Sequence, residues 1–230
     1  MDIDLSDRGR EEAAHAGRLM KNCRLDFDIA FTSVLKRAIR TAWIVLEEMD
    51  RMWILLLPCW RLNERSYGAL EGERKSEMEK IYGASQVHLW RRGFSERPPA
   101  LSKDDRRYPG WDRRYWAIEE KDLPSTESLQ DAMQRMLPLW QGQILPQLKR
   151  GRNVLVVSHG NTIRSLVKHI EGISNEDIEK IEIATATPLL YEMDETMRLI
   201  RRRLTVTDPP SGNKFSLLGS SYAGERPSFS

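Results

Sequence analysis

The sequence lacks several features, and each absence excludes a class of protein. No apolar run approaches the roughly 20 residues that a membrane-spanning helix requires. The acidic start, Met1–Asp4, contains no apolar core, so we expect no signal peptide. Net charge is only +2, from 36 basic and 34 acidic residues, whereas general nucleic-acid binding needs a marked basic surplus. We therefore expect neither a membrane nor a nucleic acid as a partner.

Cysteine and histidine are scarce as well. The two cysteines, Cys23 and Cys59, have no metal-type spacing and are too few for a disulfide framework, which favours a reducing, cytoplasmic location. The four histidines form no HxH or HxxxH pair, so the sequence predicts no metal site. Apolar residues make up 40% and charged residues 30% of the 230 residues, which is typical of a globular chain with one sizeable core.

The first 60 residues alternate between helical and strand patterns. Ser6 is suited to cap a helix that continues to about Asn22, and residues 27–32 alternate apolar and polar side chains as a strand does. Apolar residues then recur at helical spacing over residues 39–46, and the apolar run at residues 52–57 predicts a buried strand. This alternation favours an α/β fold in which helices cover a sheet.

The rest of the chain contains a long irregular segment and an end of different composition. Residues 95–124 are rich in proline, arginine and aromatic residues, which predicts a long functional excursion over the surface. Residues 126–148 have a helical pattern that Pro138 interrupts, and residues 188–193 have the pattern of a last strand. The Ser-, Gly- and Pro-rich composition at residues 207–230 predicts a disordered tail.

The segment Ser158–Asn161 lies where an apolar run, residues 153–157, gives way to a helical pattern. A histidine at such a junction stands where α/β proteins bind anions. Gly160 permits a tight turn, and Asn161 suits a helix cap. His159 is therefore a candidate for binding a phosphoryl group and stabilising charge during its transfer. The alternative is an isolated histidine that is satisfied by local hydrogen bonds.

Arginines and one glutamate complete the candidates. Arg37 lies near the start of its predicted helix, and adjacent arginines occur at Arg91–Arg92 and Arg113–Arg114. Guanidinium groups bind phosphate and carboxylate in a bidentate manner, although most surface arginines are inert, and for Arg113–Arg114 both interpretations stay open. Glu64 lies between two arginines, where a carboxylate suits general acid–base chemistry or simple surface pairing.

Four motifs in this order resemble the cofactor-dependent phosphoglycerate mutases, including the bisphosphoglycerate mutases, of the histidine phosphatase superfamily. The motifs are Thr32–Ala38, Arg61–Gly68, Trp90–Arg92 and Ser158–Asn161. The resemblance implies a three-layer α/β fold with a mostly parallel sheet in a domain spanning residues 1–200. It implies a cytoplasmic isomerase of glycolysis that interconverts 2- and 3-phosphoglycerate through a phosphohistidine primed by 2,3-bisphosphoglycerate. It also implies a homodimer and side activity as a bisphosphoglycerate synthase or phosphatase.

The resemblance further implies roles for eight residues of this chain, carried over by their positions in and near the motifs. Glu64 resembles the proton donor and acceptor, and His159 resembles the histidine that stabilises the transferring phosphoryl group. Arg37 resembles a phosphate clamp, and Asn161 resembles a pocket residue beside the phosphoryl site. The expected contacts to substrate phosphate or carboxylate are Tyr67, Lys75, Arg91 and Arg92.

The chain departs from this family at its ends. Family members begin with a strand that ends in Arg-His-Gly, whose histidine is phosphorylated, and this motif is absent from the sequence. We therefore expect an N-terminally truncated domain without its first, central strand, and with unpaired backbone groups on the neighbouring strands. Because net domain stability is only about 5–15 kcal/mol, the sequence predicts poor stability and no mutase turnover. The alternative function is a catalytically inactive family member that binds anions or joins intact subunits in a dimer.

Overall fold

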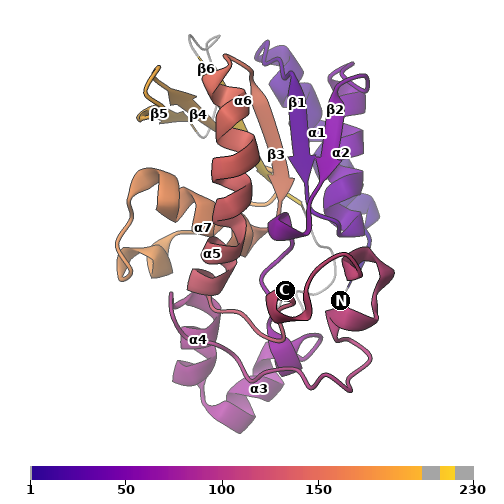
Figure 1. Cartoon of the computed structure of the whole chain (residues 1–230), viewed down its shortest axis with the longest axis vertical. Coiled ribbons are helices and arrows are strands. Elements are labelled where there is room, and N and C mark those ends of the chain that lie inside the picture. Colours follow the sequence, from indigo (N-terminus) through magenta and orange to yellow (C-terminus); the bar gives the residue numbers. More distant parts are fainter. Residues whose placement is uncertain (1, 204–212, 221–230) are drawn as a thin grey trace.

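The computed structural model describes residues 2–203 and 213–220, which form one mixed six-stranded sheet with helices on both faces (Figure 1). The strand order is β2-β1-β3-β6-β4-β5. The pairs β2–β1, β1–β3 and β3–β6 are parallel, whereas β4 runs antiparallel to both β6 and β5. The strands are β1 (Ile29–Thr32), β2 (Leu55–Pro58), β3 (Val154–Ser158), β4 (Leu189–Met193), β5 (Leu199–Arg203) and β6 (Asn213–Gly219).

The helices lie before, between and after the first three strands. The α-helices are α1 (Asp7–Asn22), α2 (Lys36–Glu48), α3 (Lys75–Tyr82), α4 (Ala84–Arg92), α5 (Leu129–Leu139), α6 (Leu145–Lys149) and α7 (Gly160–Glu171). A π-helical segment, Trp140–Ile144, joins α5 to α6. Short 3-10 turns cover Trp60–Leu62, Gly68–Leu70, Pro109–Trp111, Arg113–Tyr115, Glu120–Asp122 and Asp177–Lys180. None of the helices in the described ranges is long and apolar enough to cross a membrane.

Local sequence signals account for the N-terminal half of this architecture. The hydroxyl of Ser6 accepts the N–H of Gly9 at 3.0 Å, so the predicted cap of α1 is confirmed. The predicted strand at residues 27–32 is β1, and the helical pattern at residues 39–46 falls within α2. The predicted α/β fold with helices covering a sheet is therefore confirmed.

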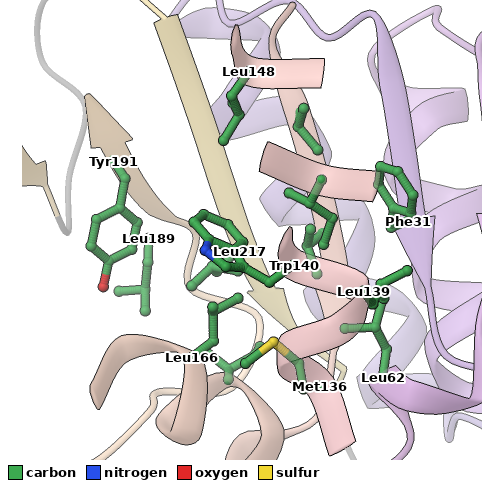
Figure 2. Close-up of a cluster of buried hydrophobic side chains, with 14 of the residues drawn as sticks. Phe31, Leu62, Met136, Leu139, Trp140, Leu148, Leu166, Leu189, Tyr191 and Leu217 are labelled. Atoms are coloured by element: carbon green, nitrogen blue, oxygen red, sulfur yellow. The ribbon is translucent and has the colours of Figure 1, made fainter. Parts of the chain in front are cut away.

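The two faces of the sheet carry separate hydrophobic cores. On one face, β-strand residues such as Phe31 and Leu217 pack with Met136 of α5 and Leu166 of α7 (Figure 2). On the other face, alternate strand residues pack against α1 and α2. This second core includes Ala30, Leu155, Leu218, Met20 and Val45. Because side chains alternate across a strand, these strands place apolar side chains on both faces of the sheet, between two layers of helices, which produces three layers.

The predicted tail is wrong for residues 213–219. These residues form β6, which lies inside the sheet between β3 and β4 and pairs five residues with each neighbour. We expected a gap at the centre of the sheet, with unpaired backbone groups on the neighbouring strands. This expectation is wrong for the described residues, because the C-terminal strand β6 occupies an interior position and pairs with both neighbours. The α/β domain also continues past the predicted boundary at residue 200, because β5 crosses it. Residues 207–212 and 221–230 of the predicted tail lie outside the described residues.

Three smaller expectations also differ from the structure. The run at residues 52–57 was expected to be buried, but β2 is an edge strand, and Met52 and Trp53 before it are 65% and 76% exposed. Residues 188–193 do not contain the last strand, because β5 and β6 follow. The helix at Pro138 is not broken: α5 includes this residue and continues through the π-helical segment into α6. The missing proline N–H is therefore accommodated within one long helix.

Candidate active site

The strands β1, β2 and β3 point toward the end of the molecule that holds α3, α4 and the long segment between α4 and α5 (Figure 1). A cavity of about 750 Å³ lies at this end. Its wall is unusually rich in guanidinium groups. The arginines lining it are Arg37, Arg65, Arg106, Arg107, Arg113, Arg114 and Arg135, and the carboxylates are Asp2, Glu64, Glu71 and Asp112. The predicted excursion at residues 95–124 thus forms one side of a basic cavity.

His159 lies at the carboxyl end of β3 and immediately precedes α7. Only 2% of the residue is exposed, and it is not part of the cavity wall. Its Nε2 lies 2.8 Å from Ser33 Oγ, and its Nδ1 lies 3.2 Å from Ser220 Oγ. Burial, together with the nearby charges of Arg37 and Arg135, holds the pKa of His159 well below its ordinary value of 6.5. The ring is therefore neutral at neutral pH.

The substitution His159→Asn is expected to remove part of the pH dependence of folding stability. The unfolded chain protonates this histidine near pH 6.5, whereas the folded chain keeps it neutral well below that pH. The unfolded state then binds more protons, so this contribution to stability is complete above about pH 6.5 and falls on acidification, by up to about 1.4 kcal/mol per pH unit.

Urea unfolding of the wild type and of His159→Asn, from about pH 8 to about pH 5, measures this effect. The difference in unfolding free energy between the two proteins should shrink as the pH falls. His169, whose pKa is also lowered by burial, is present in both proteins and cancels. Parallel pH profiles would contradict the neutral assignment of His159.

Three predicted residues meet at the cavity. Arg37 is 6% exposed in the first turn of α2, and Glu64 follows the turn after β2. Tyr67 forms part of the wall, and its hydroxyl accepts the side-chain N–H of Asn161 at 3.2 Å. Asn161 therefore contacts the cavity through Tyr67 and does not cap α7. Gly160 occupies the first turn of α7, where an added Cβ would have open space, so the tight turn expected there does not require glycine.

Three other predicted residues lie outside the cavity wall. Lys75 lies on α3 with its Nζ 3.2 Å from Glu79 Oε1. Arg92 donates to the carbonyl oxygens of Glu179 and Ile181 at 3.0 and 3.3 Å, so its guanidinium is used to hold the segment around the 3-10 turn Asp177–Lys180. Arg91 is half-buried at the end of α4. The structure does not bring these three residues to the cavity wall. Their expected contacts to substrate stay predictions.

Arg135 is a site residue that the sequence analysis missed. Its guanidinium forms a buried ion pair with Glu127 at 2.6 Å, and the two side chains are only 6% and 4% exposed. It also donates to the carbonyl oxygens of the turn before Glu64, which belong to Trp60, Arg61 and Asn63. The sequence feature that could have indicated its burial is its position on the apolar face of α5, three residues after Ala132 and four before Leu139.

Asn63 is a second missed residue, and it connects the elements around the cavity. Its Oδ1 accepts the N–H of Val34 at 3.1 Å, and its Nδ2 donates to the hydroxyl of Tyr115 at 2.8 Å. Its carbonyl oxygen accepts from Thr162 Oγ1 at 2.6 Å. Burial raises the pKa of Tyr115, so this phenol is a neutral hydrogen-bonding group at the wall. A polar network thus joins the ends of β1, β2 and β3 around the cavity.

Within the described ranges, no three His, Cys, Asp or Glu side chains are grouped to hold a metal ion. All four histidines are described, and the other three lie on helices, namely His15 on α1, His88 on α4 and His169 on α7. None of these three lines the cavity. The arrangement therefore provides a cavity with more arginines than carboxylates in its wall, and one buried histidine on which two of those arginines act.

The chain is similar to a known protein family and to several solved structures. The family model of the histidine phosphatase superfamily (branch 1) matches residues 1–104 and 100–203. A mycobacterial glucosyl-3-phosphoglycerate phosphatase superposes with a TM-score of 0.62 and 19% identity, over 92% of this chain and 90% of that chain. A putative alpha-ribazole-5′-P phosphatase from Escherichia coli gives 0.62 and 18%, over 92% and 87%. A phosphoglycerate mutase from Bacillus anthracis gives 0.50 and 21%, over 74% and 70%. At identities this low, the superpositions show a shared fold alone.

Proposed function

Since this chain belongs to the histidine phosphatase superfamily (branch 1), a superfamily of phosphatases and mutases, we propose that its cavity binds a small phosphorylated acid of the phosphoglycerate class. The observation that carries this proposal is the concentration of seven arginines in one cavity wall. Guanidinium groups bind phosphate and carboxylate oxygens through paired, charge-assisted hydrogen bonds. A ligand that carries both a phosphate and a carboxylate can contact arginines from several separate segments of the cavity wall at once.

The placement of these arginines supports a ligand with more than one anionic group. Arg37 comes from α2, and the Arg106–Arg107 and Arg113–Arg114 pairs come from the long segment before α5. Arg135 of α5 adds positive charge only, because its N–H groups all bond within the protein. Several of the arginines are already partly neutralised, as Arg114 is by Asp2 of the wall at 2.6 Å. A multiply charged ligand therefore competes with carboxylates of the wall, and it must offer strong acceptors such as phosphate oxygens.

The finer proposal is a phosphoglycerate mutase, with Glu64 as proton donor and acceptor and His159 as the histidine beside the phosphoryl group. The motif order and the position of Glu64 on the cavity wall support it. The charge of the cavity also suits 2,3-bisphosphoglycerate as a ligand. Priming by this compound does not fit the residues present, however, because a phosphohistidine needs an exposed acceptor ring. His159 is buried and bonded at both nitrogens, and the other histidines lie outside the cavity wall.

We therefore propose binding without transfer for this chain, which favours the alternative of a catalytically inactive family member. Hydrolysis of a phosphoester through a phosphohistidine, as a phosphatase would carry it out, needs the same missing acceptor. Glu64 then forms part of the ligand-binding wall, His159 stays buried and is not part of that wall, and neither completes a reaction. A homodimer and a cytoplasmic location stay predictions.

The substitution Arg37→Ala is expected to weaken binding of 3-phosphoglycerate by about 10- to 100-fold, because one charge-assisted hydrogen-bonding group is lost. Isothermal titration calorimetry on the whole chain measures the affinity. Arg113→Ala, at an exposed position of the wall, provides a second variant in case loss of the buried Arg37 disturbs folding. Arg8→Ala is the matched control, because Arg8 pairs with Glu12 on the exposed surface of α1.

A parallel assay with 2- and 3-phosphoglycerate and catalytic 2,3-bisphosphoglycerate tests the absence of turnover. We expect no interconversion and no phosphorylated histidine in the mass spectrum of the protein. Unchanged affinity in both cavity variants would contradict the binding proposal. Interconversion by this chain would instead favour the mutase.

A further inference from the structure

The carboxyl end of β6 lies beside His159. Gly219 pairs with Ser158, the residue before the histidine, in the parallel ladder between β3 and β6. The N–H of Ser220 donates to the carbonyl oxygen of Ser158 at 2.8 Å, and the carbonyl oxygen of Gly219 accepts the N–H of Ala186 at 3.1 Å. The backbone leading into Ser220 is therefore fixed, and β6 brings the hydroxyl of this serine to the imidazole ring.

Two serine hydroxyls hold the two ring nitrogens of His159. Ser33 Oγ lies 2.8 Å from Nε2, and Ser220 Oγ lies 3.2 Å from Nδ1. A neutral imidazole has one donor nitrogen and one acceptor nitrogen. Ser33 Oγ also accepts the N–H of Leu35 at 3.1 Å, which leaves its own proton for Nε2. In this pattern Nε2 is the acceptor, and the ring proton lies on Nδ1.

The surroundings of His159 disfavour a charged ring. The charged groups that act on it are Arg37 of α2 and Arg135 of α5, both cationic, and the ring is buried. In a Ser-His-Asp triad, a carboxylate at Nδ1 stabilises the imidazolium that forms during catalysis. A serine hydroxyl at Nδ1 orients the ring but supplies no negative charge. The site therefore selects a neutral histidine in one orientation.

We propose that Ser220 is a positioning residue that accepts the Nδ1–H of His159 and so fixes Nε2 as the lone-pair nitrogen of the ring. Because Ser220 reaches the ring only when β6 is in the sheet, the C-terminal strand controls which hydrogen bonds His159 makes. The consequence for a ligand rests on the proposed function: a bound phosphorylated acid would meet a wall that includes Arg37 and Arg135, and the buried histidine that these two charges act on would add no positive charge.

Histidine NMR on the whole chain tests this assignment. Long-range ¹H–¹⁵N correlation spectra of protein labelled with ¹⁵N-histidine distinguish the two neutral tautomers. At neutral pH we expect the Nδ1–H pattern for His159, with the other three histidines as internal references. Ser220→Ala should lower the ratio of this tautomer to the other by about three- to tenfold, because one neutral hydrogen bond is lost. Ser220→Thr should restore it, because threonine retains the hydroxyl.

Ser174→Ala is the matched control, because this serine bonds Asp177 on the exposed surface. An Nε2–H tautomer in the wild type, or an unchanged ratio in a folded Ser220→Ala variant, would overturn the proposal. The wild-type spectrum alone decides the assignment if Ser220→Ala does not fold. Failure to bind 3-phosphoglycerate by a chain with the expected tautomer would contradict the proposed function and leave the role of Ser220 standing.

Discussion

A chain that ends at Arg203 is expected to lose cooperative unfolding, whereas a chain that ends at Ser220 is expected to keep it. Removal of β6 leaves β3 and β4 without the strand that lies between them. Five paired positions on each side then lose their hydrogen-bonding partners in the middle of the sheet. Unpaired backbone groups at such a position are costly because they are cut off from water.

The side chains of β6 add to this loss. Leu217 and Leu218 are fully buried, and they belong to the cores on opposite faces of the sheet. Burial of a leucine side chain contributes about 1.5–3 kcal/mol. Together with the two ladders, the loss approaches the about 5–15 kcal/mol by which a typical domain is stable. We therefore expect loss of the fold.

Urea unfolding followed by circular dichroism and tryptophan fluorescence measures the outcome. The chain ending at Ser220 retains every described contact of β6 and serves as the control. Leu217→Asp in the full chain separates the role of β6 from that of residues 204–212, because it leaves chain length unchanged. A cooperative transition with an unchanged denaturant dependence in the chain ending at Arg203 would show that β6 is dispensable.

The contrast between α1 and β6 shows what the sequence predicts about this fold. The cap at Ser6 and the helical spacing of apolar residues in α2 act within one segment, so their pattern is sufficient. Residues 213–219 lie in a Ser-, Gly- and Pro-rich region, and their local composition indicates disorder. Their strand conformation comes from pairing with β3 and β4, and strand formation depends strongly on such context. The amino-acid pattern of residues 213–219 alone therefore does not predict that they pair with β3 and β4.

The candidate site shows the same difference between residues that a local motif predicts and residues whose role depends on distant contacts. Glu64, Arg37 and Tyr67 were predicted from motifs and line the cavity. Arg92 was predicted from the same resemblance, but its guanidinium bonds backbone carbonyls near the 3-10 turn Asp177–Lys180. Arg135 was missed because a single arginine in a helical pattern usually faces solvent. Its burial depends on Glu127 and on three carbonyl groups of a distant turn, which only the folded chain brings together.

Removing one partner of the Glu127–Arg135 pair is expected to destabilise the protein by about 3–5 kcal/mol, because the remaining charge is buried without its counterion. In Glu127→Leu, Arg135 loses contacts to Oε1 and Oε2 at 2.6 and 3.0 Å. The N–H of Ser66 loses its acceptor Oε2 as well. The turn that carries Glu64 is held by the same guanidinium, so binding of 3-phosphoglycerate should weaken in parallel with stability.

The double variant Glu127→Leu/Arg135→Met distinguishes an unpaired charge from the loss of the pair itself. Replacement of a whole buried ion pair by apolar side chains is often close to neutral, so we expect the double variant to unfold at a urea concentration nearer to the wild type than Glu127→Leu does. Glu120→Gln is the surface control, because Glu120 pairs with Lys103 in the open, where solvent screens the interaction. If Glu127→Leu were no less stable than the double variant, the buried charge of Arg135 would need no counterion. The pair would then act through packing alone, and the turn before Glu64 would be held by the remaining hydrogen bonds.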